Sequence, residues 1–105
     1  MNEISVTELK RRHDAGDDFM LLDVREPDEL EIASIPWATV IPVGDIPARI
    51  DELPRDKPIV VMCHAGGRST RVTQFLEANG YDNAMNLTGG ITAWSAQIDP
   101  SVLTY

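Results

Sequence analysis

One short segment of the chain, residues 61–70, gathers the side chains that could do covalent chemistry. Its sequence is Val61-Met62-Cys63-His64-Ala65-Gly66-Gly67-Arg68-Ser69-Thr70. Gly66 and Gly67 permit dihedral angles that turn successive backbone N–H groups toward one point. A helix predicted to follow would add its positive N-terminal end, and Arg68 would add a planar, permanent positive charge. All of these features favour a thiolate over a thiol, so the segment predicts a reactive Cys63 that also binds an anion.

Other interpretations of the same residues have to be weighed. A single cysteine after a buried strand is often no more than a small core residue. A glycine-rich turn between strand and helix is also typical of a phosphate loop, but the Gly-Lys-Ser/Thr ending of such loops is absent. His64 could act as a base or contact the anion, although a residue next to a nucleophile often points away from it. A thiolate stabilised by an electropositive loop needs no separate base.

The surrounding sequence predicts the elements that would position this loop. Residues 59–62 are fully apolar and rich in β-branched side chains, which is typical of a central parallel strand. Residues 69–79 carry the apolar stripe of a helix that ends before Gly80. Further strands are predicted at 20–24, 39–41 and 83–87, and further helices between Ser5 and Gly16, at 27–32, at 45–52 and after Gly90. This alternation indicates an α/β fold with a mostly parallel sheet, in which ligands bind at the carboxyl ends of the strands, where Cys63 lies.

Composition and charge narrow the possible functions. The chain has 105 residues with no repeat or flexible linker, so residues 1–105 are expected to form one domain. Its net charge of −8 argues against binding nucleic acid. No carboxylate occurs between Ile59 and Leu76, a stretch that includes His64, Arg68 and Arg71, and this favours a local anion site.

Several classes of site and location are not expected. One cysteine excludes an internal disulfide and any multi-cysteine metal site. There is no metal-ligand cluster and no nucleotide-binding fingerprint, so no metal or organic cofactor is predicted. No apolar run is long enough to cross a membrane, and the N-terminus lacks the pattern of a secretory signal. A cytoplasmic monomer is therefore expected.

Four motifs, in order along nearly the whole chain, resemble the rhodanese family. They are Asp-Val-Arg-Glu at 23–26, the block from Ile35-Pro36 to Ile41-Pro42, the loop from Cys63 to Ser69, and Gly89-Gly90 followed by Trp94. The C-terminal end, residues 94–105, is similar to the rhodanese domains of sulfur-carrier adenylyltransferases. The second motif departs from the family pattern at Ala33-Ser34 and at Trp37, which would either fill the core or shape the rim of the pocket.

The resemblance implies a five-stranded, mostly parallel sheet with helices on both faces. It implies that Cys63 takes a sulfane sulfur from a donor such as thiosulfate or a protein persulfide. The Cys63 persulfide then passes that sulfur to cyanide, a thiol or a sulfur-carrier protein. The residues implied to hold the outer sulfur through backbone amides are His64, Ala65, Gly66, Gly67 and Arg68, with Arg68 closing the ring. Asp23, Arg25 and Ser69 would support the loop from behind.

Two other functions remain open. One is a relay or non-catalytic module that binds a sulfur-trafficking protein; the acid-rich run at 26–31 could dock a basic partner, or form a solvated helix face. The other is a cysteine phosphatase or arsenate reductase. Related phosphatases place five residues between the cysteine and the arginine, whereas four separate Cys63 from Arg68. The shorter loop favours a single sulfur atom over a tetrahedral phosphate.

Overall fold

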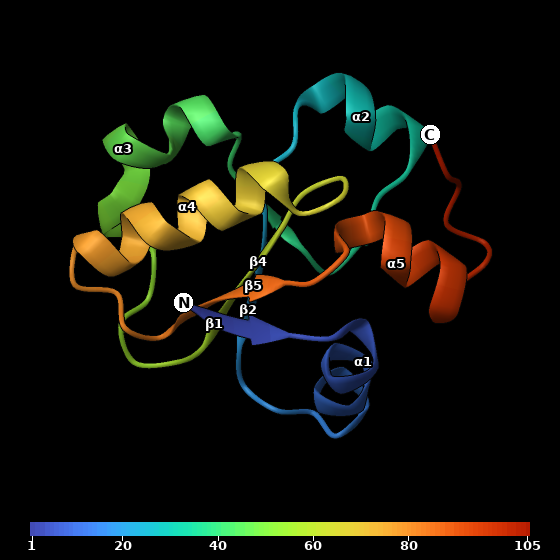
Figure 1. The fold of residues 1–105 in the computed structure, drawn as a ribbon, viewed down its shortest axis with the longest axis horizontal. Coiled ribbons are helices and arrows are strands. Elements are labelled where there is room, and N and C mark those ends of the chain that lie inside the picture. Colours follow the sequence, from blue (N-terminus) through green and yellow to red (C-terminus); the bar gives the residue numbers. More distant parts are fainter.

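Five parallel strands form a single sheet in the order β1-β5-β4-β2-β3 (Figure 1). The computed structural model describes all 105 residues. The strands are β1 (Asn2–Ile4), β2 (Met20–Asp23), β3 (Thr39–Val40), β4 (Ile59–Met62) and β5 (Ala84–Leu87). The helices are α1 (Val6–Asp14), α2 (Pro27–Ile32), α3 (Ile46–Arg49), α4 (Gly67–Ala78) and α5 (Gly90–Gln97), with short 3-10 turns, η1 (Val43–Asp45) and η2 (Ile50–Glu52), on either side of α3. The α/β class and the five-stranded parallel sheet are confirmed.

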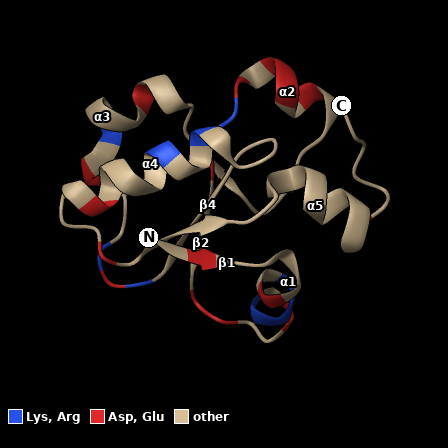
Figure 2. Cartoon of the chain, in the orientation of Figure 1, with Lys and Arg blue, Asp and Glu red and all other residues tan.

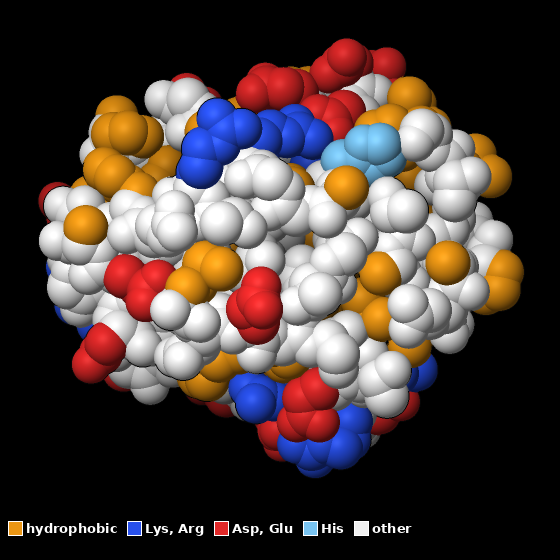
Figure 3. Space-filling model, in the orientation of Figure 1, with side chains coloured by type: hydrophobic (Ala, Val, Ile, Leu, Met, Phe, Trp, Pro, Cys, Tyr) orange, Lys and Arg blue, Asp and Glu red, His pale blue; other side chains and the backbone are white.

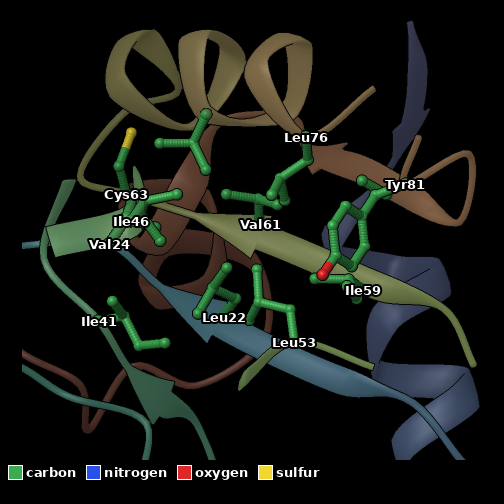
Figure 4. Close-up of a cluster of buried hydrophobic side chains, with 12 residues drawn as sticks. Leu22, Val24, Ile41, Ile46, Leu53, Ile59, Val61, Cys63, Leu76 and Tyr81 are labelled. Carbon is green, nitrogen blue, oxygen red and sulfur yellow. The ribbon is translucent and has the colours of Figure 1, made fainter. Parts of the chain in front are cut away.

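The helices cover both faces of the sheet, because the central strand β4 is apolar on both sides. Successive residues of β4 alternate between two buried clusters, as the twofold repeat of a strand requires. Ile59 and Val61 pack toward α3 and α4, while Val60 and Met62 pack toward α1 and α5. Cys63 continues this alternation and lies in the α3 and α4 cluster, where Figure 4 shows it above Val24 and Ile46.

The central strand thus delivers the cysteine to the carboxyl edge of the sheet. β4 has β2 on one side and β5 on the other, and all four of its residues are fully buried. The chain leaves this strand at Cys63 and enters α4 at Gly67. The loop between them lies on the same edge of the sheet as the starts of α2 and α5 (Figure 1).

Some elements differ from those that the sequence predicts. β1 is missing from the expected strands, because only Ile4 of its three residues is buried and the segment has no apolar alternation to reveal it. α4 begins at Gly67, two residues before the predicted Ser69, since the loop glycine already starts the helical turn. The helix expected over 45–52 is broken into η1, α3 and η2. None of the helices combines the length and apolar character that crossing a bilayer would need.

Candidate active site

The sulfur of Cys63 is enclosed by the turn that begins α4. Its side chain is buried, and the residue is only 1% exposed. The backbone N–H of Gly66 donates a hydrogen bond to Sγ over 3.1 Å, and Ser69 Oγ lies 3.3 Å from the same sulfur. Gly66 has φ +124°, a value that side chains rarely tolerate, and this conformation turns its N–H toward the sulfur. The first N–H groups of a helix have no partner within it, so the start of α4 offers its donors to this point.

The same contacts control the protonation of the cysteine. Burial raises the pKa of the Cys63 thiol, because it disfavours the charged form. Hydrogen bonds from the Ser69 side chain and from the backbone amides of Ser69, Gly66 and Arg68 act in the opposite direction and outweigh it. The pKa of Cys63 is therefore lowered below that of an ordinary cysteine. The direction of this shift favours the thiolate form, and the reactivity of Cys63 stays a prediction.

Ser69 contacts the sulfur directly, whereas the family resemblance implies only that it supports the loop from behind. Its Oγ also donates to the carbonyl of Gly66 over 3.1 Å, so the hydroxyl can turn from that carbonyl to the sulfur when the thiol ionises. Thr70 binds the same Gly66 carbonyl over 2.7 Å, with no hydrogen bond to the sulfur.

Replacing Ser69 with alanine should make Cys63 less reactive at low pH. A hydrogen bond to a charged group contributes about 1.5 kcal/mol or more, so alkylation by iodoacetamide at mildly acidic pH should slow roughly tenfold. The rise of the rate with pH should move to higher pH, since the substitution removes a group that lowers the thiol pKa. Thr70→Val is the matched control and should leave the profile in place. Coinciding profiles for wild type and Ser69→Ala would show that Ser69 does not stabilise the thiolate.

The start of α5 holds the other side of the loop. The N–H of Ile91 donates to the carbonyl of Cys63 over 3.0 Å, and Thr92 donates to the carbonyl of His64 through both its N–H, at 3.1 Å, and its Oγ1, at 3.0 Å. These hydrogen bonds orient the carbonyl groups of Cys63 and His64 toward α5, and the backbone amides of the loop then face the sulfur. Gly90 sits against this junction, with φ +57° and no room for a side chain.

Arg68 is held by a carboxylate, and its guanidinium is therefore not free above the sulfur. It forms two hydrogen bonds with Glu29 of α2, at 2.5 and 2.8 Å. The pKa of Glu29 is lowered to about 2, mainly by this contact with Arg68. Glu29 is consequently ionised throughout the pH range in which a cysteine titrates. The closing of the ring by Arg68 remains a prediction that would require this pair to rearrange.

Tyr105 completes the pair from the far end of the chain. Its hydroxyl donates to Glu29 over 2.6 Å and accepts from Arg25 over 3.0 Å. Its ring stacks on His64, with centroids 3.9 Å apart and planes 9° from parallel. The imidazole of His64 therefore packs against the C-terminal residue, and no hydrogen bond joins it to Sγ.

Behind the loop, Asp23 and Arg25 form a buried ion pair. Arg25 donates to both carboxylate oxygens of Asp23, with contacts of 2.7 to 3.2 Å, and both side chains are essentially inaccessible to solvent. The N–H of Arg25 also donates to Asp23, over 3.1 Å. The pair ties the end of β2 to the chain that leads into α2, which carries Glu29.

Replacing Asp23 with asparagine should destabilise the fold strongly. The guanidinium of Arg25 would remain buried without its counter-charge, and a broken buried pair costs about 3–5 kcal/mol. Urea unfolding followed by circular dichroism would measure the loss. Asp51→Asn, at an exposed carboxylate with no ion-pair partner, is the control and should change stability by less than about 0.5 kcal/mol. An equal, small effect in both variants would contradict this account of the pair.

The other residues that the sequence analysis singles out make no hydrogen bond to the Cys63 sulfur. Ala65 is exposed at the loop tip. Gly67 has ordinary helical dihedrals and open space where a Cβ would stand, so of the two loop glycines only Gly66 adopts the unusual dihedral angles that the sequence analysis expects of the pair. Trp37 packs edge-on against Phe19 and Trp94, away from the loop, and so fills the core. His13 lies at the exposed surface and stacks on Trp37 with centroids 4.0 Å apart.

Sequence reasoning missed three residues of the site. Glu29 belongs to the acid-rich run at 26–31, which the sequence predicts either to dock a basic partner or to form a solvated helix face, but it is largely buried by Arg68 and Tyr105. Its place on the helix following Asp23 and Arg25 is the one signal that could have found it. Gly90 belongs to the Gly89-Gly90 motif, but the sequence does not show that it packs against the loop carbonyls. Tyr105 carries no signal, because nothing in its neighbourhood shows that the chain returns to the loop.

Comparison with known proteins decides the family. The model of the rhodanese-like domain matches residues 5–97, which include every residue of the site except Tyr105. The chain belongs to the rhodanese-like family. The solved structure of a rhodanese-like domain protein from Staphylococcus aureus has the same fold, with a TM-score of 0.86, 32% identity and coverage of 100% of this chain and 99% of the other.

Relatives of this rhodanese-like domain are of two kinds. A putative sulfurtransferase of Bacillus subtilis, YtwF, is 37% identical over 100 residues, which is 95% of this chain and 96% of the relative. Other relatives are longer. The chain spans 31% of the chloroplastic rhodanese-like/PpiC domain-containing protein 12 of Arabidopsis thaliana, at 42% identity and 85% coverage of this chain. It spans 26% of the probable adenylyltransferase/sulfurtransferase MoeZ of Mycobacterium tuberculosis, at 35% identity and 97% coverage of this chain. The resemblance to adenylyltransferase-linked domains is confirmed.

Proposed function

We propose that this rhodanese-like domain is a sulfurtransferase in which Cys63 carries the transferred sulfur as a persulfide. Relatives named as sulfurtransferases support a role in sulfur transfer or in a sulfur-carrier relay. The observation that carries the finer proposal is the position of the sulfur. A cysteine whose pKa is lowered faces the backbone amides of Gly66, Arg68 and Ser69 at the N-terminus of α4, which suits both a thiolate and an anionic persulfide.

The first half-reaction loads the enzyme. The Cys63 thiolate attacks the outer sulfur of thiosulfate, an S–S bond forms, and the S–S bond of thiosulfate breaks. Sulfite leaves with the electron pair, and the enzyme keeps the sulfur as a persulfide anion. The backbone amides of the loop from His64 to Arg68 would receive the terminal sulfur and its charge, because donors fixed in advance stabilise charge without reorganising.

The second half-reaction transfers the sulfur from the Cys63 persulfide to the acceptor. Cyanide, or a thiolate, attacks the terminal sulfur and forms a new bond to it. The S–S bond to Cys63 breaks and restores the thiolate, which Gly66 and Ser69 stabilise again. No external base is needed, since the nucleophile enters each half-reaction already ionised. No three His, Cys, Asp or Glu side chains lie close enough together to hold a metal ion.

Steady-state kinetics test this order of events. Rates of thiocyanate formation measured at several thiosulfate and cyanide concentrations should give parallel reciprocal plots, because sulfite leaves before cyanide binds. Intersecting plots would mean that both substrates bind together, and would contradict a persulfide intermediate.

A protein-fed relay is a second candidate for the same residues. Cys63 is 1% exposed and Arg68 is neutralised by Glu29, so a small dianion finds no free guanidinium at the sulfur. Relatives named as a putative sulfur carrier protein and as adenylyltransferase/sulfurtransferases support this reading. Supplying sulfur from a cysteine desulfurase in place of thiosulfate distinguishes the two. A relay would load Cys63 from the desulfurase much faster than from thiosulfate at equal sulfur concentration.

A further inference from the structure

A pocket of about 200 Å³ lies beside the site, between α3 and α4. Its lining is apolar except for one arginine. The residues are Val43, Ile46, Pro47, Arg71, Val72 and Phe75. Ile46 and Val72 form its floor and belong to the same buried cluster as Cys63. Figure 4 shows Ile46 next to Cys63, so the pocket lies at the same edge of the sheet as the reactive sulfur.

Among the Lys and Arg side chains, Arg71 alone has no carboxylate, aromatic ring or backbone carbonyl as a partner. Seven of the nine Lys and Arg side chains form ion pairs with carboxylates. Arg55 packs over the ring of Tyr81 and donates to backbone carbonyls. Arg71 has neither a carboxylate nor a ring, although the protein carries a net charge of −8. Its position is one helical turn beyond Arg68. Figure 2 shows that the Lys and Arg positions of α4 lie in the half of the helix where it begins.

The apolar surface continues outside the pocket. Phe75 is 37% exposed, and Pro47 is exposed beside it. Figure 3 shows hydrophobic side chains gathered over α3, next to the Lys and Arg side chains of this face. The pocket is smaller than the ~300–1,000 Å³ sites that take drug-sized ligands, so its size suits one anchoring side chain. An apolar anchor buried in a pocket, with polar contacts at its rim, is an arrangement that suits a protein docking site.

We propose that this pocket docks the protein that exchanges sulfur with Cys63, through an apolar side chain followed by a carboxylate. The apolar side chain fills the space between Ile46, Val72 and Phe75, and the carboxylate pairs with Arg71. The proposal rests on the proposed function only for the identity of the partner as a sulfur donor or acceptor. The pocket and its unpaired arginine are independent of it.

Disulfide trapping tests the docking directly, because Cys63 is the only cysteine. The probes are peptides of the form acetyl-Cys-(Gly)n-Leu-Asp-amide, with linkers of one to three glycines, as mixed disulfides with 2-mercaptoethanol. The Cys63 thiolate attacks the peptide sulfur, and 2-mercaptoethanol leaves as the thiolate. Intact mass then gives the fraction of protein that keeps each peptide as 2-mercaptoethanol is raised.

At one linker length, the Leu-Asp peptide should survive about fivefold more 2-mercaptoethanol than its Leu-Asn counterpart, as expected for a partly exposed charge pair of about 1 kcal/mol. It should also survive more than its Ala-Asp counterpart, because alanine leaves the apolar pocket unfilled. Arg71→Met should reduce the Leu-Asp peptide to the level of Leu-Asn and leave the preference for Leu over Ala. Arg49→Met, which removes a paired cation on α3 outside the pocket, should change nothing.

Several results would overturn the proposal. They are equal retention of all three peptides at every linker length, a preference for Asp that survives Arg71→Met, or no exchange with any peptide. Competition by hexanoate as effective as the peptide itself would assign the pocket to a small carboxylate. A dimer in sedimentation that Phe75→Asp dissociates would assign it to a second copy. The exchange requires no persulfide, so a chain that never loads from thiosulfate can still show or fail the preference.

Discussion

Cys63→Ser should reduce sulfur transfer from thiosulfate to cyanide to the uncatalysed rate, a loss of roughly 10³-fold or more. A serine hydroxyl stays protonated at neutral pH and cannot take a sulfane sulfur to form a persulfide. The fold should persist, since the smaller oxygen can still accept from the Gly66 N–H that now reaches the sulfur. Thiocyanate formation gives the rate, and circular dichroism gives the fold.

The matched control for this loss is Ser69→Ala. It leaves the sulfur in place and changes only its hydrogen bonding, so it should slow the reaction without abolishing it. Folded Cys63→Ser protein that turns over at more than a few per cent of the wild-type rate would exclude Cys63 as the sulfur carrier.

Gly90→Ala should damage both stability and activity, although residue 90 contacts no substrate. A Cβ at this position would lie 2.5 Å from the carbonyl oxygens of both Cys63 and His64, and φ is +57°. The neighbouring atoms are backbone, so they cannot swing aside. Overpacking and a left-handed conformation together should cost roughly 2–5 kcal/mol of unfolding free energy.

The folded fraction of Gly90→Ala should also lose activity. The loop carbonyls would be pushed off the start of α5, and the amides that face the sulfur would move with them. Misplacement of about 1 Å can cost 10²-fold in rate. Gly44→Ala is the control, because nothing lies within 4 Å of its Cβ position, and it should leave both quantities nearly unchanged. Wild-type activity in Gly90→Ala would show that the α5 junction does not position the loop.

The parts of the fold that sequence reasoning recovers are those with strong local patterns. β4 is predicted correctly because a short, fully apolar run that is rich in β-branched residues and follows Pro58 is typical of a strand covered on both faces. α2 is predicted at its exact bounds because Pro27 favours a first helical turn. β1 is not predicted, since its edge position leaves two of its three residues exposed and its pairing with β5 joins the two ends of the chain.

The residues of the site likewise fall into those that local sequence patterns predict and those that they do not. Cys63 and the start of α4 are contiguous in sequence, so their juxtaposition follows from a strand, a turn and a helix. The contact of Glu29 with Arg68 spans 39 residues, and that of Tyr105 with Glu29 spans 76. Such contacts depend on how the elements pack, and a charged residue in an acidic run gives no local sign of being buried. The position of Arg68 at the start of α4 follows from the same local pattern, but its carboxylate partner could not be anticipated.

The most direct test of the account is the intact mass of the reduced protein after incubation with thiosulfate. The mass of the protein should increase by about 32 Da, one sulfur atom. This increase should be lost on adding cyanide or a thiol and should be absent in Cys63→Ser. The same gain in Cys63→Ser would place the sulfur elsewhere. No gain from thiosulfate or from a cysteine desulfurase would contradict the persulfide at Cys63 and with it the proposed sulfurtransferase.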